Sequence, residues 1–324
     1  MFARPTHTSS LISRSSRSFT HATAGEEALD RWAGQKKGLI TLSETLHTER
    51  VSDLYITLPT RDGTRRPYSG PMKSGALGFG HHLAFFHPRT PERLLRSDGM
   101  DPDFCPPEPF VRRMWAGGRI EWRNPLIIGG KARALFSVSS VDKKAAAVPM
   151  VFVSQRIEIA NEGEEECAVL EERTHVYRAP GTHRRTSREG KQVLDRFTPS
   201  PTTLFRFSAL TFNGHRIHLD RDYAQEAEGH AERLVHGPLM ALMLLETFAF
   251  YHPKVQMKRF EYQALNPVIV DRELTFHWSR SGLEEMILWV QCKSGTVGMK
   301  GKVTFEHGST DTTGRSSELM SLCL

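Results

Sequence analysis

Residues with proton-transfer chemistry are concentrated between Phe207 and Asp220. Two imidazoles, an amide and a guanidinium fall within the six positions from Asn213 to His218. Imidazole changes its protonation state near neutral pH, so His218 can act there as a general base. The mixture predicts a site that handles protons.

A second feature follows a short polar stretch, where Gly237-Pro238 begins a long apolar run that ends at Tyr251. A run that is apolar on every face predicts a buried helix. Proline suits the first turn of a helix, and the free N–H groups there favour a developing negative charge. Because Gly237 allows a ligand to approach the backbone, we expect its N–H to stabilise an oxyanion. The two features together predict a base and an oxyanion hole.

Other interpretations of these residues remain open. His218 alone could be a core histidine that donates to a backbone carbonyl. A metal site is a further alternative, which we disfavour because a guanidinium lies within the set and close-spaced His/Cys clusters are lacking elsewhere; its ligands would be His215, His218, Asp220 and Asp222. For Glu246, inside the apolar run, a structural ion pair is favoured over catalysis, because it lies nine residues beyond Gly237.

Two sequence repeats indicate how these elements are positioned. The sequence Ala-Phe-Phe-His-Pro at 84–88 recurs as Ala-Phe-Tyr-His-Pro at 249–253. The segment 119–128 likewise resembles the segment 259–270, and residues with period-two alternation follow each copy. We expect a duplicated α+β unit in which each copy has one long central helix wrapped by an antiparallel sheet.

The composition divides the chain further. Residues 1–25 are rich in Ser and Thr and contain three Arg and no acid, a composition typical of a mitochondrial transit peptide. The predicted divisions are this peptide, an N-terminal repeat at 26–178, a basic linker at 179–200, a catalytic repeat at 201–308 and a flexible tail at 309–324. Four scattered cysteines predict free thiols. The apolar run after Gly237-Pro238 is too short to span a bilayer, so we expect no membrane span.

Charge excludes one class of partner and suggests another. Of the formal net charge of +6, residues 1–25 supply +3, which leaves too little for nucleic-acid binding on charge alone. The linker contains Arg184, Arg185, Arg188, Lys191 and Arg196. A basic loop can simply be solvated, or it can attract the phosphates of coenzyme A or an acidic acyl-carrier protein. Salt dependence of KM in an Arg184→Ala, Arg185→Ala variant would separate the two.

The stretch from Leu204 to Leu245 resembles the MaoC-like hydratase/dehydratase family, particularly the mitochondrial type 2 hydroxyacyl-thioester dehydratases and the mesaconyl-CoA hydratases. The resemblance implies a double hot-dog fold. Its motif has an Asp and a His five residues apart, which fall on Asn213 and His218. An amide cannot accept the proton, so Asn213 would orient water while His218 alone transfers the proton. Gly237 matches the backbone donor to the thioester oxygen.

The same resemblance implies the activity. We expect a carbon–oxygen lyase that reversibly dehydrates (R)-3-hydroxyacyl thioesters to trans-2-enoyl thioesters in mitochondrial fatty acid synthesis, in the matrix. The alternatives are a hydratase of a short dicarboxylic enoyl-CoA and a non-catalytic acyl-thioester-binding protein. The expected substrate is an acyl-CoA or acyl-carrier-protein thioester, without cofactor or metal, and the protein would be a monomer or homodimer. His215, Arg216 and His236 are the expected substrate-binding residues, although the family pattern gives no role to the first two.

Overall fold

The computed structural model describes residues 27–34, 39–144, 149–178 and 193–307. The predicted transit peptide, most of the predicted linker and the predicted tail lie outside these ranges. The strands are β1 (Ile40–Thr45), β2 (Arg112–Trp122), β3 (Lys131–Lys144), β4 (Met150–Asn161), β5 (Val169–Arg178), β6 (Val193–Phe197), β7 (Val255–Ala264), β8 (Leu274–Arg280), β9 (Glu285–Cys292) and β10 (Val297–His307). The helices are α2 (Thr48–Thr57), α3 (Pro201–Leu210), α4 (Arg216–Leu219) and α5 (Gly237–Tyr251), with the short turns η1 (His81–Ala84), η2 (Glu92–Leu94) and η3 (Tyr223–Ala227).

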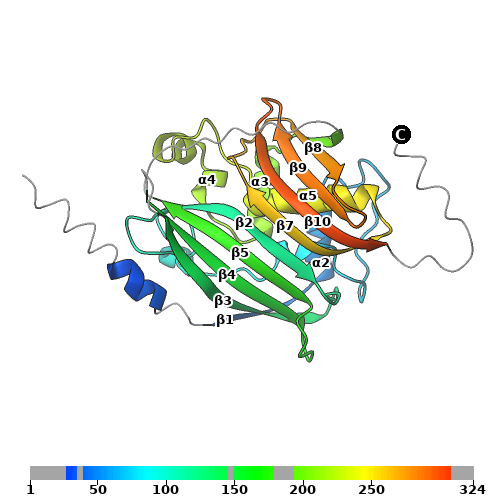
Figure 1. Ribbon diagram of the computed structural model, residues 1–324, viewed down its shortest axis with the longest axis horizontal. Coiled ribbons are helices and arrows are strands. Elements are labelled where there is room, and N and C mark those ends of the chain that lie inside the picture. Colours follow the sequence, from blue (N-terminus) through cyan, green and yellow to red (C-terminus); the bar gives the residue numbers. More distant parts are fainter. Residues whose placement is uncertain (1–26, 35–38, 145–148, 179–192, 308–324) are drawn as a thin grey trace, which may run out of the picture.

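The strands form one sheet that contains the same unit twice. Its order is β1-β3-β4-β5-β2-β7-β10-β9-β8-β6. The first half of the sheet is β1-β3-β4-β5-β2. The second half, read from the opposite edge, is β6-β8-β9-β10-β7, so the same strand arrangement occurs twice. Figure 1 shows the two halves side by side, the first in blue to green and strands β7 to β10 of the second in gold to red. The predicted duplication and the α+β double hot-dog architecture are confirmed.

The join between the two halves fixes the symmetry of the molecule. Strands β2 and β7 pair antiparallel, with Ile120 opposite Phe260. These two residues hold the same place in the repeated sequences Arg-Ile-Glu-Trp and Arg-Phe-Glu-Tyr. A pseudo-twofold axis therefore passes between them. Arg259 pairs with Glu121 across the join at 3.0 Å, and the axis relates these two facing positions to Glu261 and Arg119, which also face each other.

Helix α5 is the central helix of the second repeat. Its residues from Leu239 to Phe248 are all buried, as expected for a helix that is apolar on every face. Its one carboxylate, Glu246, is 3% exposed. That carboxylate accepts hydrogen bonds from Arg61 Nε at 2.6 Å and His81 Nε2 at 2.7 Å. The predicted structural ion pair of Glu246 is confirmed.

The first repeat lacks the long central helix that we predicted. At the corresponding place it has only η1, one turn of 3₁₀-helix. The residues before η1 explain this difference, because glycine and proline are the weakest helix formers. Five of them fall between positions 70 and 80: Gly70, Pro71, Gly75, Gly78 and Gly80.

Three other observations bear on predictions made from the sequence. Residues Val193–Phe197, which we assigned to the linker, form β6 and pair with β8, so the second half of the sheet begins before residue 201. The remaining divisions of the chain stay predictions. Cys105, Cys167 and Cys292 are free thiols. Among the described residues, no helix is both long and apolar enough to cross a membrane.

Candidate active site

Four of the predicted site residues meet at a cavity of about 480 Å³ that both repeats line. From the second repeat come Asn213, His215, His218 and Gly237. From the first repeat come residues of β2 and β5 and of the long loop between η1 and β2. The cavity therefore exists only where the two halves meet.

A tight turn after α3 presents the polar side chains. The N–H of His215 donates to Asn213 Oδ1 at 3.0 Å, which fixes the amide side chain in a local turn. The long loop of the first repeat, between η1 and β2, packs against this turn. Arg216 N–H donates to Asp98 O at 2.9 Å, and a Cβ on Gly99 would lie 2.1 Å from Gly214 O. The first repeat thus positions the loop that carries the second repeat's histidines.

The orientation of His218 suits a base. Its Nδ1 donates to the carbonyl oxygen of Leu234 at 2.7 Å, which leaves Nε2 as the unprotonated ring nitrogen. The ring lines the cavity. Burial lowers the pKa of His218 to about 4, against a smaller opposing effect of the bond to Leu234. The imidazole is neutral at pH 7 and can accept a proton.

His236 packs against the ring of His218. The two rings stack with their centroids 3.7 Å apart. His236 is fully buried and does not line the cavity, and its Nε2 shares a hydrogen bond of 2.9 Å with the hydroxyl of Ser208. Burial holds the pKa of His236 well below its usual value. We expected His236 to bind substrate; the structure places it outside the cavity lining and against the ring of His218.

The other two expected substrate-binding residues differ from each other. His215 is buried, lines the cavity and meets His218 edge to face at 5.5 Å. Burial, followed by the neighbouring His218, lowers the pKa of His215 well below its usual value. Arg216 does not line the cavity. Its guanidinium lies over the ring of Tyr223 and donates to Asp220 at 2.6 Å.

Gly237 is the first residue of α5 and packs directly on Trp115 of β2. A Cβ at Gly237 would lie 2.7 Å from Trp115 Cβ, closer than any side chain tolerates, so this contact requires glycine. The first N–H groups of a helix have no intrahelical acceptor. The Gly237 N–H is therefore available at the wall of the cavity that the residue lines.

Trp115 is itself held by a buried ion pair that the sequence patterns did not reveal. The Arg173 guanidinium lies 4.7 Å from the centre of the Trp115 ring. Arg173 Nε donates to Glu171 at 2.7 Å, and Glu171 is fully buried. Burial raises the pKa of Glu171, but the charge of Arg173 and the neighbouring His82 outweigh it and lower the pKa to about 2. No local signal marks these residues, because alternating Glu and Arg on a strand is also typical of a solvent-exposed face.

The described residues hold no group of three or more His, Cys, Asp or Glu arranged to bind a metal ion. Two members of the alternative ligand set are otherwise engaged: His218 Nδ1 with Leu234 O and Asp220 with Arg216.

A neutral, oriented imidazole, an amide and a free helix N-terminus around one cavity of a double hot-dog fold define a hydratase or dehydratase of the MaoC-like class. The sequence matches the family of type 2 hydroxyacyl-thioester dehydratases over residues 80–270, more than half of the chain. The chain belongs to this family and is a carbon–oxygen lyase.

The chain is also similar to named relatives. A protein of Chloroflexus aurantiacus named mesaconyl-C(4)-CoA hydratase is 40% identical over 215 residues, which cover 63% of this chain and 76% of the relative. A mitochondrial hydroxyacyl-thioester dehydratase type 2 of Schizosaccharomyces pombe is 29% identical over 245 residues, covering 65% and 80%.

Solved structures agree on the fold. A MaoC-like dehydratase from Phytophthora capsici matches with a TM-score of 0.61 at 13% identity, covering 86% of this chain and 99% of that one. A double hot-dog protein from Mycobacterium tuberculosis matches with a TM-score of 0.54 at 11% identity, covering 84% and 96%.

Proposed function

We propose that this protein catalyses the reversible dehydration of an (R)-3-hydroxyacyl thioester to the trans-2-enoyl thioester, with His218 as the only proton-transfer residue. The observation that carries the proposal is the orientation of His218, whose Nδ1 is bonded to Leu234 O while its ring lines the cavity. A histidine held in that way presents Nε2, its basic nitrogen, to the substrate.

In the dehydration direction, His218 Nε2 removes the α-proton of the hydroxyacyl thioester. Negative charge then develops on the thioester oxygen, and the N–H of Gly237 donates a hydrogen bond to it. The β-hydroxyl leaves with the proton that His218 returns to it, so that one water and one enoyl thioester are formed. Hydration is the reverse sequence.

Asn213 replaces the acid that the family motif has at this position. Its Oδ1 already accepts from His215 N–H, so the amide NH₂ remains as the donor that can hold the departing hydroxyl or the incoming water. Because a carboxamide is neither basic nor acidic enough to accept or give up a proton near neutral pH, both proton transfers fall to His218.

The test is hydration of crotonyl-CoA, followed as loss of enoyl-thioester absorbance, by protein lacking residues 1–25. His218→Ala should abolish most turnover, and His307→Ala, at an exposed position at the end of β10, is the matched control. Unchanged turnover in the His218 variant would disprove the assigned base. Absence of turnover in the unaltered protein, with activity gained in Asn213→Asp, would instead show that the native substrate or chemistry differs.

A second candidate substrate, a short dicarboxylic enoyl-CoA, is favoured by one observation. Arg113 lines the cavity, and among the described residues it pairs with no carboxylate; its NH2 group donates to His175 Nε2 at 2.9 Å. A guanidinium that has no carboxylate partner among the described residues suits a carboxylate on the acyl group, as the name of the Chloroflexus relative would require. Comparing kcat/KM for crotonyl-CoA and mesaconyl-C4-CoA, with Arg113→Gln alongside, distinguishes the two substrates.

The cellular role proposed here is fatty acid synthesis in the mitochondrial matrix. It is supported by the composition of residues 1–25 and by the name of the S. pombe relative. The thioester carrier is coenzyme A or an acyl-carrier protein, and the internal duplication allows the protein to act as a monomer or a homodimer. Import of a fusion carrying residues 1–25 tests the location.

A further inference from the structure

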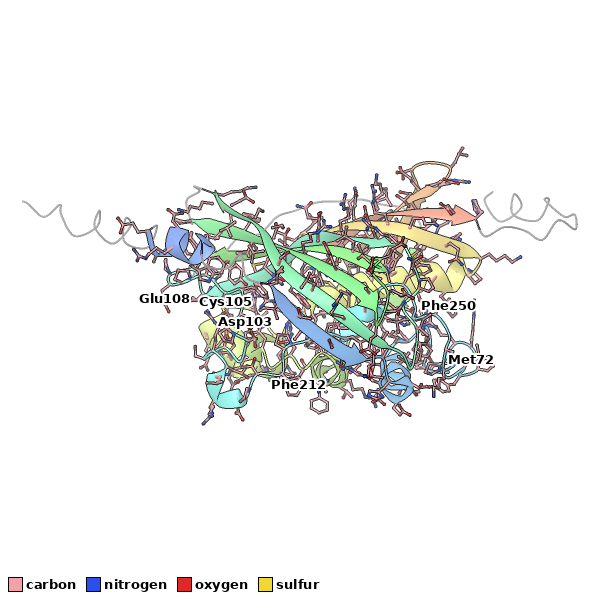
Figure 2. All side chains as sticks on the ribbon, turned by 90° about the horizontal axis from the view of Figure 1, so that it is seen from below. Met72, Asp103, Cys105, Glu108, Phe212 and Phe250 are labelled. Carbon is pink, nitrogen blue, oxygen red and sulfur yellow. The ribbon has the colours of Figure 1, made fainter. Side chains whose placement is uncertain are left out.

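A second cavity lies in the molecule, with a volume of about 720 Å³. Among the described residues, none lines both this cavity and the catalytic one. Figure 2 labels Phe250, which lines the second cavity, and Asp103 and Phe212, which line the catalytic one; Phe250 and Asp103 lie toward opposite ends of the molecule. The proposed catalytic residues are all outside the second cavity.

The pseudo-twofold axis relates the second cavity to the catalytic one. Isolated bridges join Leu234 to Ile269 in the second repeat and Ala76 to Ile127 in the first. In each repeat, residues just after the earlier of the two bridged residues, Leu234 or Ala76, line the cavity of that repeat. An Asn-Pro pair and the residue after it line the same cavity. These residues are Val235, Gly237 and 266–268 at the catalytic cavity, and 77–79 and 124–126 at the second.

The loop that carries the catalytic residues also has a counterpart. After α2, Asp62 Oδ1 accepts from Thr64 N–H at 2.9 Å, as Asn213 Oδ1 accepts from His215 N–H after α3. When Asp62 is aligned with Asn213, the position of His218 is occupied by Pro67. Pro67 lines the second cavity and has no proton to transfer. The second cavity therefore keeps the frame of the catalytic site without its base.

The lining of the second cavity combines positive charge with aromatic surface. Four cationic side chains line it and one carboxylate, Glu246, which Arg61 already pairs. The other three cations are Arg66, Arg123 and Lys258. Arg123 lies 3.6 Å from Glu121, and Lys258 lies 3.0 Å from Glu306; both carboxylates lie outside the cavity lining. Arg66 lies 3.7 Å from the centre of the Phe250 ring and pairs with no carboxylate among the described residues. Phe79 and Trp122 meet edge to face on another wall, with ring centroids 5.2 Å apart.

We propose that this cavity is a second, non-catalytic site for the nucleotide end of coenzyme A or its thioesters. The arginines and the lysine would bind phosphate groups, and the aromatic walls would contact the adenine. The choice of ligand rests on the proposed function, while the site itself rests on the symmetry and the lining. The protein would bind two molecules of the ligand and act on one.

The test is the binding stoichiometry of free coenzyme A, measured by titration calorimetry on the unaltered protein and on an Arg66→Glu, Arg123→Glu double variant. Both residues are exposed, so the variant should fold. We expect two sites in the unaltered protein. In the variant one site should weaken by at least about 100-fold, because each lost charge-assisted hydrogen bond corresponds to roughly tenfold or more in affinity. Hydration of crotonyl-CoA should remain unchanged.

An Arg272→Glu, Lys293→Glu variant is the control, since both residues are exposed, carry the same charge change and line neither cavity. A single site in the unaltered protein, or two undiminished sites in the double variant, would overturn the proposal. Adenosine 3′,5′-bisphosphate should displace coenzyme A from the second site, and inorganic phosphate should not; displacement by phosphate alone would show a plain anion site and overturn the nucleotide assignment. Two bound ligands without turnover would refute the proposed function and leave the second site standing.

Discussion

The Nδ1 atom of His218 lies 2.7 Å from the carbonyl oxygen of Leu234, three residues before the helix whose first N–H we assign to the oxyanion. The same short segment therefore fixes the tautomer of His218, through the carbonyl of Leu234, and contains the N–H of Gly237 that we assign as the oxyanion donor. Base and donor are coupled through backbone, so their relative position does not depend on long, mobile side chains.

The first prediction concerns the acid limb of the pH–rate profile. Because burial lowers the pKa of His218 to about 4, and the free base is the active form, kcat/KM should stay constant well below pH 6.5 and fall with an apparent pKa near 4. The measurement is kcat/KM for crotonyl-CoA from pH 8 downward, limited to the range in which circular dichroism shows folded protein. A limb centred near 6.5, the ordinary value of histidine, would contradict it.

The second prediction concerns Asn213→Asp. The carboxylate can still accept from His215 N–H, so stability near pH 7 should change by less than about 0.5 kcal/mol. A negative charge in the same cavity favours the protonated imidazole, so the acid limb of kcat/KM should move to higher pH. Asn213→Ala is the comparison variant: it removes acceptor and donor, and should lower kcat by about tenfold or more without that shift. Equal pH profiles for the Asp variant and the unaltered protein would show that the two side chains do not interact.

The third prediction concerns the contact between Gly237 and Trp115. In Gly237→Ala the new Cβ would lie 2.7 Å from Trp115 Cβ, so α5 or β2 must shift, at a cost of about 1–3 kcal/mol. The displaced N–H should lower kcat by about 10- to 100-fold. Gly282→Ala is the control, because its Cβ would meet Glu285 Cβ at an ordinary 3.5 Å. If Gly237→Ala keeps full kcat, the N–H of Gly237 is not the oxyanion donor.

The sequence predicted the elements whose pattern is local. The apolar run after Gly237 marked α5, and the repeated Arg-x-Glu-aromatic segments marked β2 and β7, because periodicity and repetition are visible within a few residues. The missing helix of the first repeat was not predicted. The matched Ala-Phe-Phe-His-Pro segment suggested a helix there, while the glycines and proline upstream prevented one.

The candidate site was predicted only in part for the same reason. Asn213, His215, His218 and Gly237 lie within one continuous stretch, and they do line one cavity. Arg113, Trp115 and Arg173 come from strands of the other repeat. Their proximity depends on the register of the sheet, which a single sequence does not reveal. The stacking of His236 on His218 depends instead on how α4 packs against the segment before α5, which spacing along the sequence does not reveal.

The fourth prediction concerns stability in mild acid. Burial lowers the pKa of His175, His215, His218 and His236 in the folded protein, whereas in the unfolded chain these groups titrate near 6.5. Below pH 6.5 the unfolded chain therefore binds more protons, so the free energy of unfolding falls as pH falls. For His218 this loss runs from about pH 6.5 to about 4.

The buried carboxylates act in a lower window. The pKa of Glu171 and that of Glu246 are lowered to about 2, so their contribution is present above their unfolded pKa of about 4.3 and is lost only below it. Urea unfolding at pH 7.5, 6 and 5 should show decreasing stability. Between pH 6 and 5 the free energy of unfolding should fall less steeply in His218→Ala than in the unaltered protein, by about 1.4 kcal/mol per pH unit. Constant stability over this range would mean that the imidazoles are solvated or paired in the folded state.

The last prediction concerns the ion pair between Glu246 of α5 and Arg61. Glu246→Gln preserves shape but leaves Arg61 without its counterion, and Thr60 and His81 also lose a charged acceptor. Breaking a fully buried pair costs about 3–5 kcal/mol, and we expect about 2–3 because the Arg61 side chain keeps access to water. The side chain of Arg61 is 32% exposed, against 4% for Glu246. Urea unfolding measures this loss, with Glu226→Gln, an exposed acid, as the control.

Because Glu246 does not line the catalytic cavity, kcat of the folded Glu246→Gln variant should stay within about twofold of the unaltered protein. A large loss of kcat at full stability would assign Glu246 to the chemistry, as a substitute for the carboxylate missing at Asn213. A double-mutant cycle with Arg61→Gln then separates the pair from its surroundings. A coupling energy near zero would show that His81 and Thr60, rather than Arg61, hold the carboxylate in the core.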